Sequence, residues 1–214
     1  TTVVRVERKE DGHIEGTTLF RPEDVQLGLD DKENLKLLNI YDPYVAEFFF
    51  GGQIVIVEGD TEYAAFRLVG EKFPEYKDVH IIRARGKATI VSLAKILNKF
   101  GSSYSILHDT DVPKTTRKSK NGEPPQEIIN PAWTNNTKIL SVVQNALQDG
   151  RVRLLASKRN FEEAYFDNKL SNEKPYTAIA KMRNDQELLE KIKNVLKALL
   201  DRDAPIPEGC IAWS

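Results

Sequence analysis

Two short acidic segments contain the residues of this sequence that are best suited to chemistry. Residues 58–62, Glu-Gly-Asp-Thr-Glu, directly follow the apolar run 53–57, and residues 109–111, Asp-Thr-Asp, directly follow the largely apolar run 104–108. Both segments would lie at the carboxyl ends of strands, which is where a parallel sheet binds its ligands. Because several carboxylates in one crevice repel one another unless cations neutralise them, we expect a site for hard divalent metal ions.

The backbone around these acids suits metal binding. Gly59 allows a sharp bend after Glu58, and Glu62 would lie near a helix N-terminus, whose partial positive charge favours an ionised carboxylate. Asp109 and Asp111 would point to the same face if the strand continued through them. Two Mg²⁺ or Mn²⁺ ions about 4 Å apart could then activate a water and stabilise the leaving oxygen of a phosphodiester. Any one of these acids alone would more often be a solvated or capping residue, but together, at two strand ends, they favour a metal site.

The elements that must position these acids follow from the hydrophobic pattern. Strands are predicted at residues 54–57, 80–84, 104–108 and 152–156. Helices are predicted at about 61–72, 89–100, from Thr134 or Asn136 to 147, at 160–166 and from about 175 to 201. This alternation predicts right-handed crossovers in a doubly wound α/β fold, in which a mostly parallel sheet is flanked by helices. The first and third strands would then end on the same edge of the sheet.

Two segments outside this core have a different pattern. Residues 1–50 contain a β-like stretch at 3–8, a turn at 11–12 and a predicted helix at 42–50. Residues 114–126 are polar, charged and rich in Gly and Pro, which predicts a mobile loop directly after the second acidic segment.

The composition limits the class of protein. The chain of 214 residues can form one good core or a core with a smaller lobe. With 31 basic and 32 acidic residues, the net charge of -1 means that any phosphate-binding surface must be local. The single Cys210 fits a reducing compartment, and no apolar run approaches the roughly 20 residues of a membrane helix. We therefore expect a cytoplasmic protein that does not span a membrane.

The acidic motifs resemble those of a known domain. Residues 57–62, Gly86 between a strand and a helix, and residues 107–111 together resemble the Toprim domain, which topoisomerases, bacterial primases, repair proteins and several nucleases share. The Glu-Gly-x-Thr-Glu form and the helical remainder are most similar to the overcoming-lysogenization-defect (OLD) nucleases. The resemblance covers about residues 45–167 and implies a Toprim-like, Rossmann-like fold with an additional helical lobe.

The resemblance implies roles for individual acids. Glu58 would serve as a metal ligand or general acid/base, and Asp109 and Asp111 would hold the metal. Glu62 matches a second glutamate that this nuclease branch uses as a ligand. Glu162 matches a further acid that would complete a second metal site, although its neighbour Glu163 could take that place instead.

The resemblance also implies a domain organisation. We expect a lead-in segment from an upstream domain at residues 1–50, a Toprim catalytic domain at 51–167 with an inserted loop and helix at 113–150, and a helical C-terminal lobe at 168–214. OLD proteins join this region to an upstream ATPase, and the absence of Met at Thr1 predicts a fragment, with a homodimer formed through the missing part. The pair Gly86-Lys87 lacks the other residues of a phosphate-binding P-loop, so this chain is not expected to hydrolyse ATP.

Basic residues near the acidic segments predict contact with DNA phosphates. Lys114, Arg117 and Lys118 follow the second acidic segment, and Arg159 follows the fourth strand. A solvated loop explains the first group equally well. Lys174 loosely matches a catalytic lysine and could stabilise charge on the scissile phosphate, with an exposed loop lysine as the alternative.

The leading interpretation is a Mg²⁺- or Mn²⁺-dependent DNA endonuclease that cleaves phosphodiester bonds by a two-metal mechanism. One alternative keeps the fold but changes the reaction to nucleotidyl transfer or strand passage. Another is a non-catalytic Toprim module that binds nucleic acid. The four acids argue against a pure binder, which would gain little from their mutual repulsion.

Overall fold

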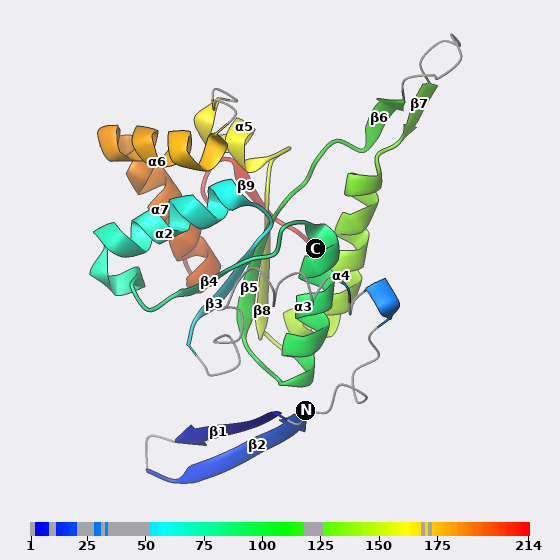
Figure 1. Ribbon diagram of the computed structural model, residues 1–214, viewed down its shortest axis with the longest axis vertical. Coiled ribbons are helices and arrows are strands. Elements are labelled where there is room, and N and C mark those ends of the chain that lie inside the picture. The colour runs from blue at the N-terminus through cyan, green and yellow to red at the C-terminus, as the bar shows by residue number, and fades with distance from the viewer. Residues whose placement is uncertain are drawn as a thin grey trace.

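A five-stranded, mostly parallel sheet forms the centre of the protein. The computed structural model describes residues 3–8, 12–20, 28–30, 33, 52–117, 126–167, 170 and 173–214. The strand order is β4-β3-β5-β8-β9, and only β9 is antiparallel to its neighbour (Figure 1). These strands are β3 (Ile54–Val57), β4 (His80–Arg83), β5 (Tyr104–Asp109), β8 (Val152–Ser157) and β9 (Cys210–Ala212). The predicted α/β fold class is confirmed.

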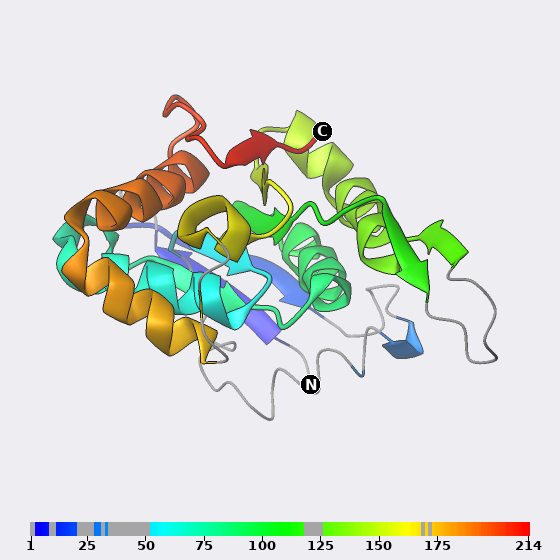
Figure 2. The ribbon, with the colours of Figure 1, turned by 90° about the horizontal axis from the view of Figure 1, so that it is seen from above.

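Helices cover both faces of this sheet, as Figures 1 and 2 show. One face packs against α2 (Asp60–Lys72), α5 (Phe161–Phe166), α6 (Lys174–Asn184) and α7 (Gln186–Leu200). The opposite face packs against α3 (Lys87–Lys99) and α4 (Pro131–Gln148). A short 3₁₀ helix, Pro74–Tyr76, follows α2. Because both faces are covered, the interior strand β3 is apolar throughout, and each of its residues is at most 4% exposed.

The register of the sheet brings the two acidic segments to one edge. β3 pairs with β5 so that Val57 lies opposite Leu107, and β5 pairs with β8 so that Asp109 lies opposite Ser157. All three strands run in the same direction, so their carboxyl ends meet there. The loop after β3, the loop after β5 and the start of α5 therefore lie next to one another.

The segment after the second acidic motif contains a hairpin. β6 (Lys114–Arg117) and β7 (Gln126–Ile129) pair in antiparallel register, with Lys114 opposite Ile129, and they project from the body of the protein (Figure 1). We refer to these two strands as the arm. The prediction of a loop across 114–126 was wrong for residues 114–117 and 126, because β-branched Thr and Ile side chains on the two strands favour extended pairing. Residues 118–125 lie outside the described part.

Several helices begin earlier than predicted, and in two of them the residue at the N-cap also differs from the predicted one. α4 begins at Pro131, because the side chain of Asn130 accepts a hydrogen bond from Ala132 N at 3.0 Å, and neither Thr134 nor Asn136 is the cap. α2 begins at Asp60 with Gly59 as its N-cap, so Thr61 lies inside the first turn and not at the cap. Both differences change which side chains face the carboxyl edge of the sheet.

The C-terminal region contains two helices and a strand. The predicted helical span from 175 to 201 is divided at Asp185, whose carboxylate accepts a hydrogen bond from Leu188 N at 3.0 Å and so begins α7. The short strand β9, which was not predicted, adds an antiparallel edge to the sheet by pairing with β8. No helix of the described residues is long and apolar enough to cross a membrane.

The N-terminal region contains a second hairpin. β1 (Val3–Arg8) pairs in antiparallel fashion with β2 (Ile14–Phe20), with a register shift between Val4 and Val6. The predicted strand at 3–8 is therefore confirmed. The predicted helix at 42–50 lies outside the described residues.

Candidate active site

Glu58, Asp109 and the start of α5 are joined by backbone hydrogen bonds. The Glu58 side chain accepts a hydrogen bond from Asp109 N at 3.1 Å, and Asp109 Oδ1 accepts one from Phe161 N at 2.9 Å. These bonds bring the two acidic segments together with a helix that lies about fifty residues later in the sequence. Each bond also fixes one side of a carboxylate and leaves its other oxygen available.

Glu62 is almost completely buried beside these groups. It is 4% exposed, and the charges of Glu162 and Glu58 act on it. Gly59 makes this position possible, because a Cβ atom at residue 59 would lie 2.9 Å from Glu62 Oε2. A larger residue at position 59 would therefore displace the Glu62 carboxylate, whereas the backbone of Gly59, with φ of -126°, is one that any residue can adopt.

Burial and mutual repulsion raise the pKa values of these carboxyls. Burial is the main cause for each of them, and it raises the pKa of Glu62 to about 8 and that of Asp109 to about 9, with added repulsion from the other acids. Burial also raises the pKa of Glu58, although the nearby Lys87 opposes this effect. Such a group releases its protons readily only when another positive charge replaces them.

Glu162 joins this group from α5. Its Oε1 accepts a hydrogen bond from Thr61 Oγ1 at 2.9 Å and lies 3.4 Å from Lys174 Nζ. Its neighbour Glu163 instead pairs with Arg159 at 2.5 Å, on the outside of the helix. The structure thus places Glu162, and not Glu163, beside Glu58, Glu62 and Asp109.

Asp111 lies at the edge of the group and its carboxylate is turned to a different partner. β5 ends at Asp109, and Asp111 has a left-handed backbone with φ of 57°, held by a hydrogen bond from its N–H to Arg159 O at 2.8 Å. Its side chain forms an ion pair with Lys87. The expectation that the two aspartates share a strand face was wrong, because the strand ends between them.

Lys87 is a residue of this site that the motif analysis did not assign. Its side chain is 3% exposed, and besides Asp111 it contacts Ala132 O at 3.2 Å. The preceding Gly86 has φ of 120° and donates its N–H to Glu58 O at 3.0 Å, so α3 begins at the same edge of the sheet as the acids. The sequence signal for Lys87 was its place directly after the glycine that follows a strand.

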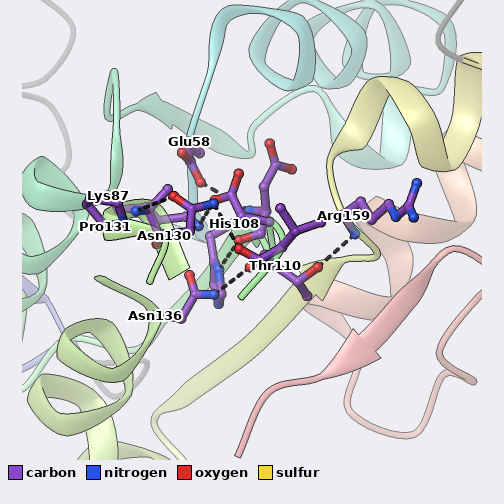
Figure 3. Close-up of polar contacts among 12 residues, drawn as sticks. Glu58, Lys87, His108, Thr110, Asn130, Pro131, Asn136 and Arg159 are labelled. Carbon is purple, nitrogen blue, oxygen red and sulfur yellow. Dashed lines mark hydrogen bonds and ion pairs between the residues drawn. The ribbon is translucent and has the colours of Figure 1, made fainter. Parts of the chain in front are cut away.

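Thr110 fixes the loop that carries the two aspartates. Its hydroxyl accepts a hydrogen bond from Arg159 N at 2.7 Å, and its carbonyl accepts one from the buried Asn136 side chain at 2.7 Å. Figure 3 shows Lys87 and Glu58 on one side of Thr110 and Arg159 on the other. The aspartate loop is therefore held from both sides of the sheet edge.

The donor set fits divalent metal ions in chemistry but is not arranged to hold one as it stands. Glu58, Glu62, Asp109 and Glu162 supply the carboxylate oxygens that Mg²⁺ and Mn²⁺ prefer. Yet no three His, Cys, Asp or Glu residues within the described ranges form a ready group of ligands. The ion pairs explain part of this, because Lys174 holds Glu162 and Lys87 holds Asp111.

The basic residues predicted to contact DNA lie in two places. Lys114 pairs with Glu127 across the arm at 2.8 Å, and Arg117 is exposed at the end of β6. Arg159 lies beside the aspartate loop and pairs with Glu163. Lys118 lies outside the described residues.

Two tryptophans and a histidine pack against one another next to the loop that carries the two aspartates. His108 is fully buried, and its ring meets Trp213 edge to face at 5.5 Å between centroids. Trp213 in turn meets Trp133 of α4 at 5.7 Å. Burial lowers the pKa of His108 to about 4, so this histidine is neutral at physiological pH and supports the loop by packing.

Comparison with known proteins agrees with the motifs. The chain matches the model of the TOPRIM domain of overcoming-lysogenization-defect-protein-like proteins at residues 49–111. Among solved structures it is similar to the C-terminal region of the Burkholderia pseudomallei OLD protein, with 16% sequence identity and a TM-score of 0.31, over 71% of this chain and 85% of that chain. No curated protein matches the chain. Residues 49–111, which contain both acidic segments, are therefore similar to an OLD-like TOPRIM domain, and this confirms the resemblance seen in the motifs.

Proposed function

We propose that this chain is the catalytic region of a DNA endonuclease that uses two Mg²⁺ or Mn²⁺ ions to cleave phosphodiester bonds. The observation that carries the proposal is the group of carboxylates from three elements, Glu58, Glu62, Asp109 and Glu162, at the carboxyl edge of the sheet. The match to an OLD-like TOPRIM domain supports it. DNA, and an ATPase domain and second copy in a longer protein, are the partners we propose.

The four carboxylates and Asp111 would hold the ions. Bound divalent cations supply Lewis acidity for hydrolysis of a phosphodiester. Asp109 N–H holds Glu58 in place, Thr61 holds Glu162, and the loop hydrogen bonds hold the aspartates. These contacts limit the movement that the side chains would need to come together around a metal ion.

Lys174 is suited to contact the substrate. It begins α6, its side chain is 53% exposed, and its ammonium lies 3.4 Å from the metal-facing Glu162. A phosphate that reaches the carboxylates would therefore meet a positive charge on the solvent side. We assign Lys174 the stabilisation of charge on the scissile phosphate.

A plasmid nicking assay with added Mg²⁺ or Mn²⁺ tests this function. We expect Glu58→Gln and Asp109→Asn each to lower the nicking rate by more than about 100-fold, because loss of one group that stabilises transition-state charge costs about that much. The matched control is Asp60→Asn, since Asp60 belongs to the same motif but is exposed and pairs with Arg83 at 2.8 Å. Nicking that survives both site substitutions would contradict the proposal.

A binding assay separates the non-catalytic alternative. Metal and DNA binding without cleavage, by a protein whose circular dichroism shows it folded, would favour a nucleic-acid-binding module over the nuclease. Incorporation of a labelled nucleotide into a DNA end would favour nucleotidyl transfer.

A further inference from the structure

Two lysines pair with carboxylates of the site, and they differ in exposure. Lys87 Nζ pairs with Asp111, and the lysine side chain is only 3% exposed. Lys174 Nζ pairs with Glu162, and that lysine side chain is 53% exposed. Because solvent screens an exposed charge and hardly screens a buried one, the positive charge of Lys87 acts far more strongly on the carboxylates than that of Lys174.

The position of Lys87 is fixed by the backbone around it. Its ammonium is held between Asp111 and the carbonyl of Ala132, at the start of α4. It is the first residue of α3, directly after Gly86, whose N–H binds Glu58 O. The Lys87 ammonium therefore cannot move away from the carboxylates without losing its contacts with both Asp111 and Ala132 O.

The charge of Lys87 reaches beyond its ion pair. Of the charged side chains that act on Glu58, Lys87 has the largest effect, greater than that of Asp111 or Glu162. The buried ammonium therefore already neutralises part of the negative charge that would attract a divalent cation. Any such cation must enter against it.

We propose that Lys87 is a resident counter-cation that competes with divalent metal for the carboxylates, so that it keeps Asp111 out of the group and raises the metal concentration at which the site fills. This regulation rests on the proposed function only in requiring that the carboxylates bind metal. Lys87 is a positioning residue, because it acts through Asp111 and Glu58 and touches no substrate.

This proposal and a purely structural role predict different changes in metal affinity when the charge of Lys87 is removed. If Lys87 only held Asp111 in place, its uncharged variants would bind metal as tightly as the original chain or less tightly. A competing cation lowers metal affinity, so its removal must tighten binding. Like charges a few ångströms apart repel strongly where solvent screens them poorly, and we expect an effect of at least ~10-fold on affinity.

Calorimetric titration of the chain with Mn²⁺ tests this inference. We expect Lys87→Met to bind Mn²⁺ at least ~10-fold more tightly than the original chain, because the variant removes the buried charge. Lys87→Gln, which keeps a hydrogen-bond donor for Ala132 O, serves as a second neutral variant if the methionine protein does not fold. Lys87→Arg keeps the charge and should stay within about threefold of the original chain.

Lys191→Met is the matched control, because it removes an exposed lysine that pairs with Glu187 of α7 at 2.8 Å and, within the described residues, with no carboxylate of the site. Its affinity for Mn²⁺ should change by no more than about threefold, as for other solvent-exposed pairs. Thermal unfolding gives an independent measurement. Without metal, Lys87→Met should melt below the original chain, because Asp111 loses its partner, and added Mn²⁺ should reverse that order.

The outcomes distinguish this inference from the proposed function. If the original chain binds Mn²⁺ and folded Lys87→Met and Lys87→Gln bind it no more tightly, the counter-cation role is overturned while the nuclease proposal stands. If metal binds as predicted in every variant but no DNA is cut, the nuclease proposal fails and the counter-cation role stands. If neither the original chain nor any variant binds Mn²⁺, both fail.

Discussion

The carboxylates of the candidate site form two sets that are neutralised differently. The inner set is Glu58, Glu62 and Asp109, which take part in no ion pair among the described residues. The outer set is Asp111 and Glu162, each of which already has a lysine partner. The inner acids are held by backbone N–H groups and burial, and the outer acids are held by cations.

This difference explains how a crowded acidic site can fold without metal. Protons neutralise Glu62 and Asp109, whose pKa values burial raises to about 8 and about 9, and lysines neutralise the outer acids. A cation that entered would displace protons from the first set and ammonium groups from the second. The two sets should therefore respond differently to pH, to substitution and to DNA.

The largest effect is expected from pH acting on the inner set. Burial raises the pKa of Glu62 from 4.5 to about 8 and that of Asp109 from 3.8 to about 9. The metal-free folded protein thus keeps protons that the unfolded chain loses, so stability is complete below about pH 4 and falls as pH rises toward 9. Urea unfolding in EDTA should show a loss of up to roughly 1.4 kcal/mol per pH unit for each group.

Two controls make this pH prediction specific to the inner set. Glu62→Gln should flatten the curve of unfolding free energy against pH, whereas Glu163→Gln, on the outside of α5, should leave it unchanged. Saturating Mg²⁺ should also flatten the curve at high pH, because it replaces the protons. A metal-free curve that rises between pH 6 and 9 would show that the inner acids are not neutralised by protons.

Glu162 of the outer set can be compared with its neighbour Glu163, which lies outside both sets. We expect Glu162→Gln to lower the nicking rate by about 100-fold, because it removes a carboxylate that lies beside the inner acids. Loss of one group that stabilises transition-state charge typically costs about that much. Glu163→Gln removes an exposed pair with Arg159, keeps an oxygen that can accept from Asn160 Nδ2, and should change the rate by less than about threefold. Equal losses in the two variants would mean that α5 contributes its stability and not a ligand.

A smaller effect is expected at Thr61, whose hydroxyl holds Glu162. Thr61→Val keeps the shape of the side chain but removes the 2.9 Å hydrogen bond, and loss of such a supporting contact typically lowers metal affinity about 10-fold or more. Thr61→Ser keeps the hydroxyl and should restore most of the affinity. Calorimetry with Mn²⁺ measures both, and a serine variant as weak as the valine variant would assign the effect to packing.

The smallest effect is expected on the arm, which begins next to the outer acid Asp111. Arg117→Gln should weaken DNA binding a few-fold and reduce the slope of log affinity against log salt by about 0.9, the value for one lost phosphate contact. Lys197→Gln is the control, because α7 ends at the opposite edge of the sheet, where Leu199 O accepts from Ser105. An unchanged salt slope for Arg117→Gln would remove the arm from the DNA-binding surface.

The central fold could be predicted because its strands are buried on both faces. Runs such as 54–57 are apolar throughout, and such a run has few alternatives to a central parallel strand. The three-residue β9 has no such pattern, because a strand of that length is too short to show one and depends on pairing with β8. The start of α4 was misplaced because the side chain of Asn130 caps the helix, and residues 134–137, Thr-Asn-Asn-Thr, are of types that also cap helices well.

The inner acids could be predicted because their position depends only on where strands end. The outer set depends on contacts between residues that are distant in sequence: Thr61 and Glu162 are 101 residues apart, and Lys87 and Asp111 are 24 apart. The choice between Glu162 and Glu163 depends on the rotation of a one-and-a-half-turn helix, which Asn160 fixes by capping Glu163 N. No local pattern contains this information.

The edge-to-face cluster of His108, Trp133 and Trp213 gives the protein an intrinsic fluorescent reporter. The sequence contains two tryptophans: Trp213 contacts His108, the residue that precedes Asp109, and Trp133 contacts Trp213. Trp133 also follows Ala132, whose carbonyl binds Lys87. Intrinsic tryptophan fluorescence therefore originates from one place beside the carboxylates, and its change during a titration follows the site without an attached dye.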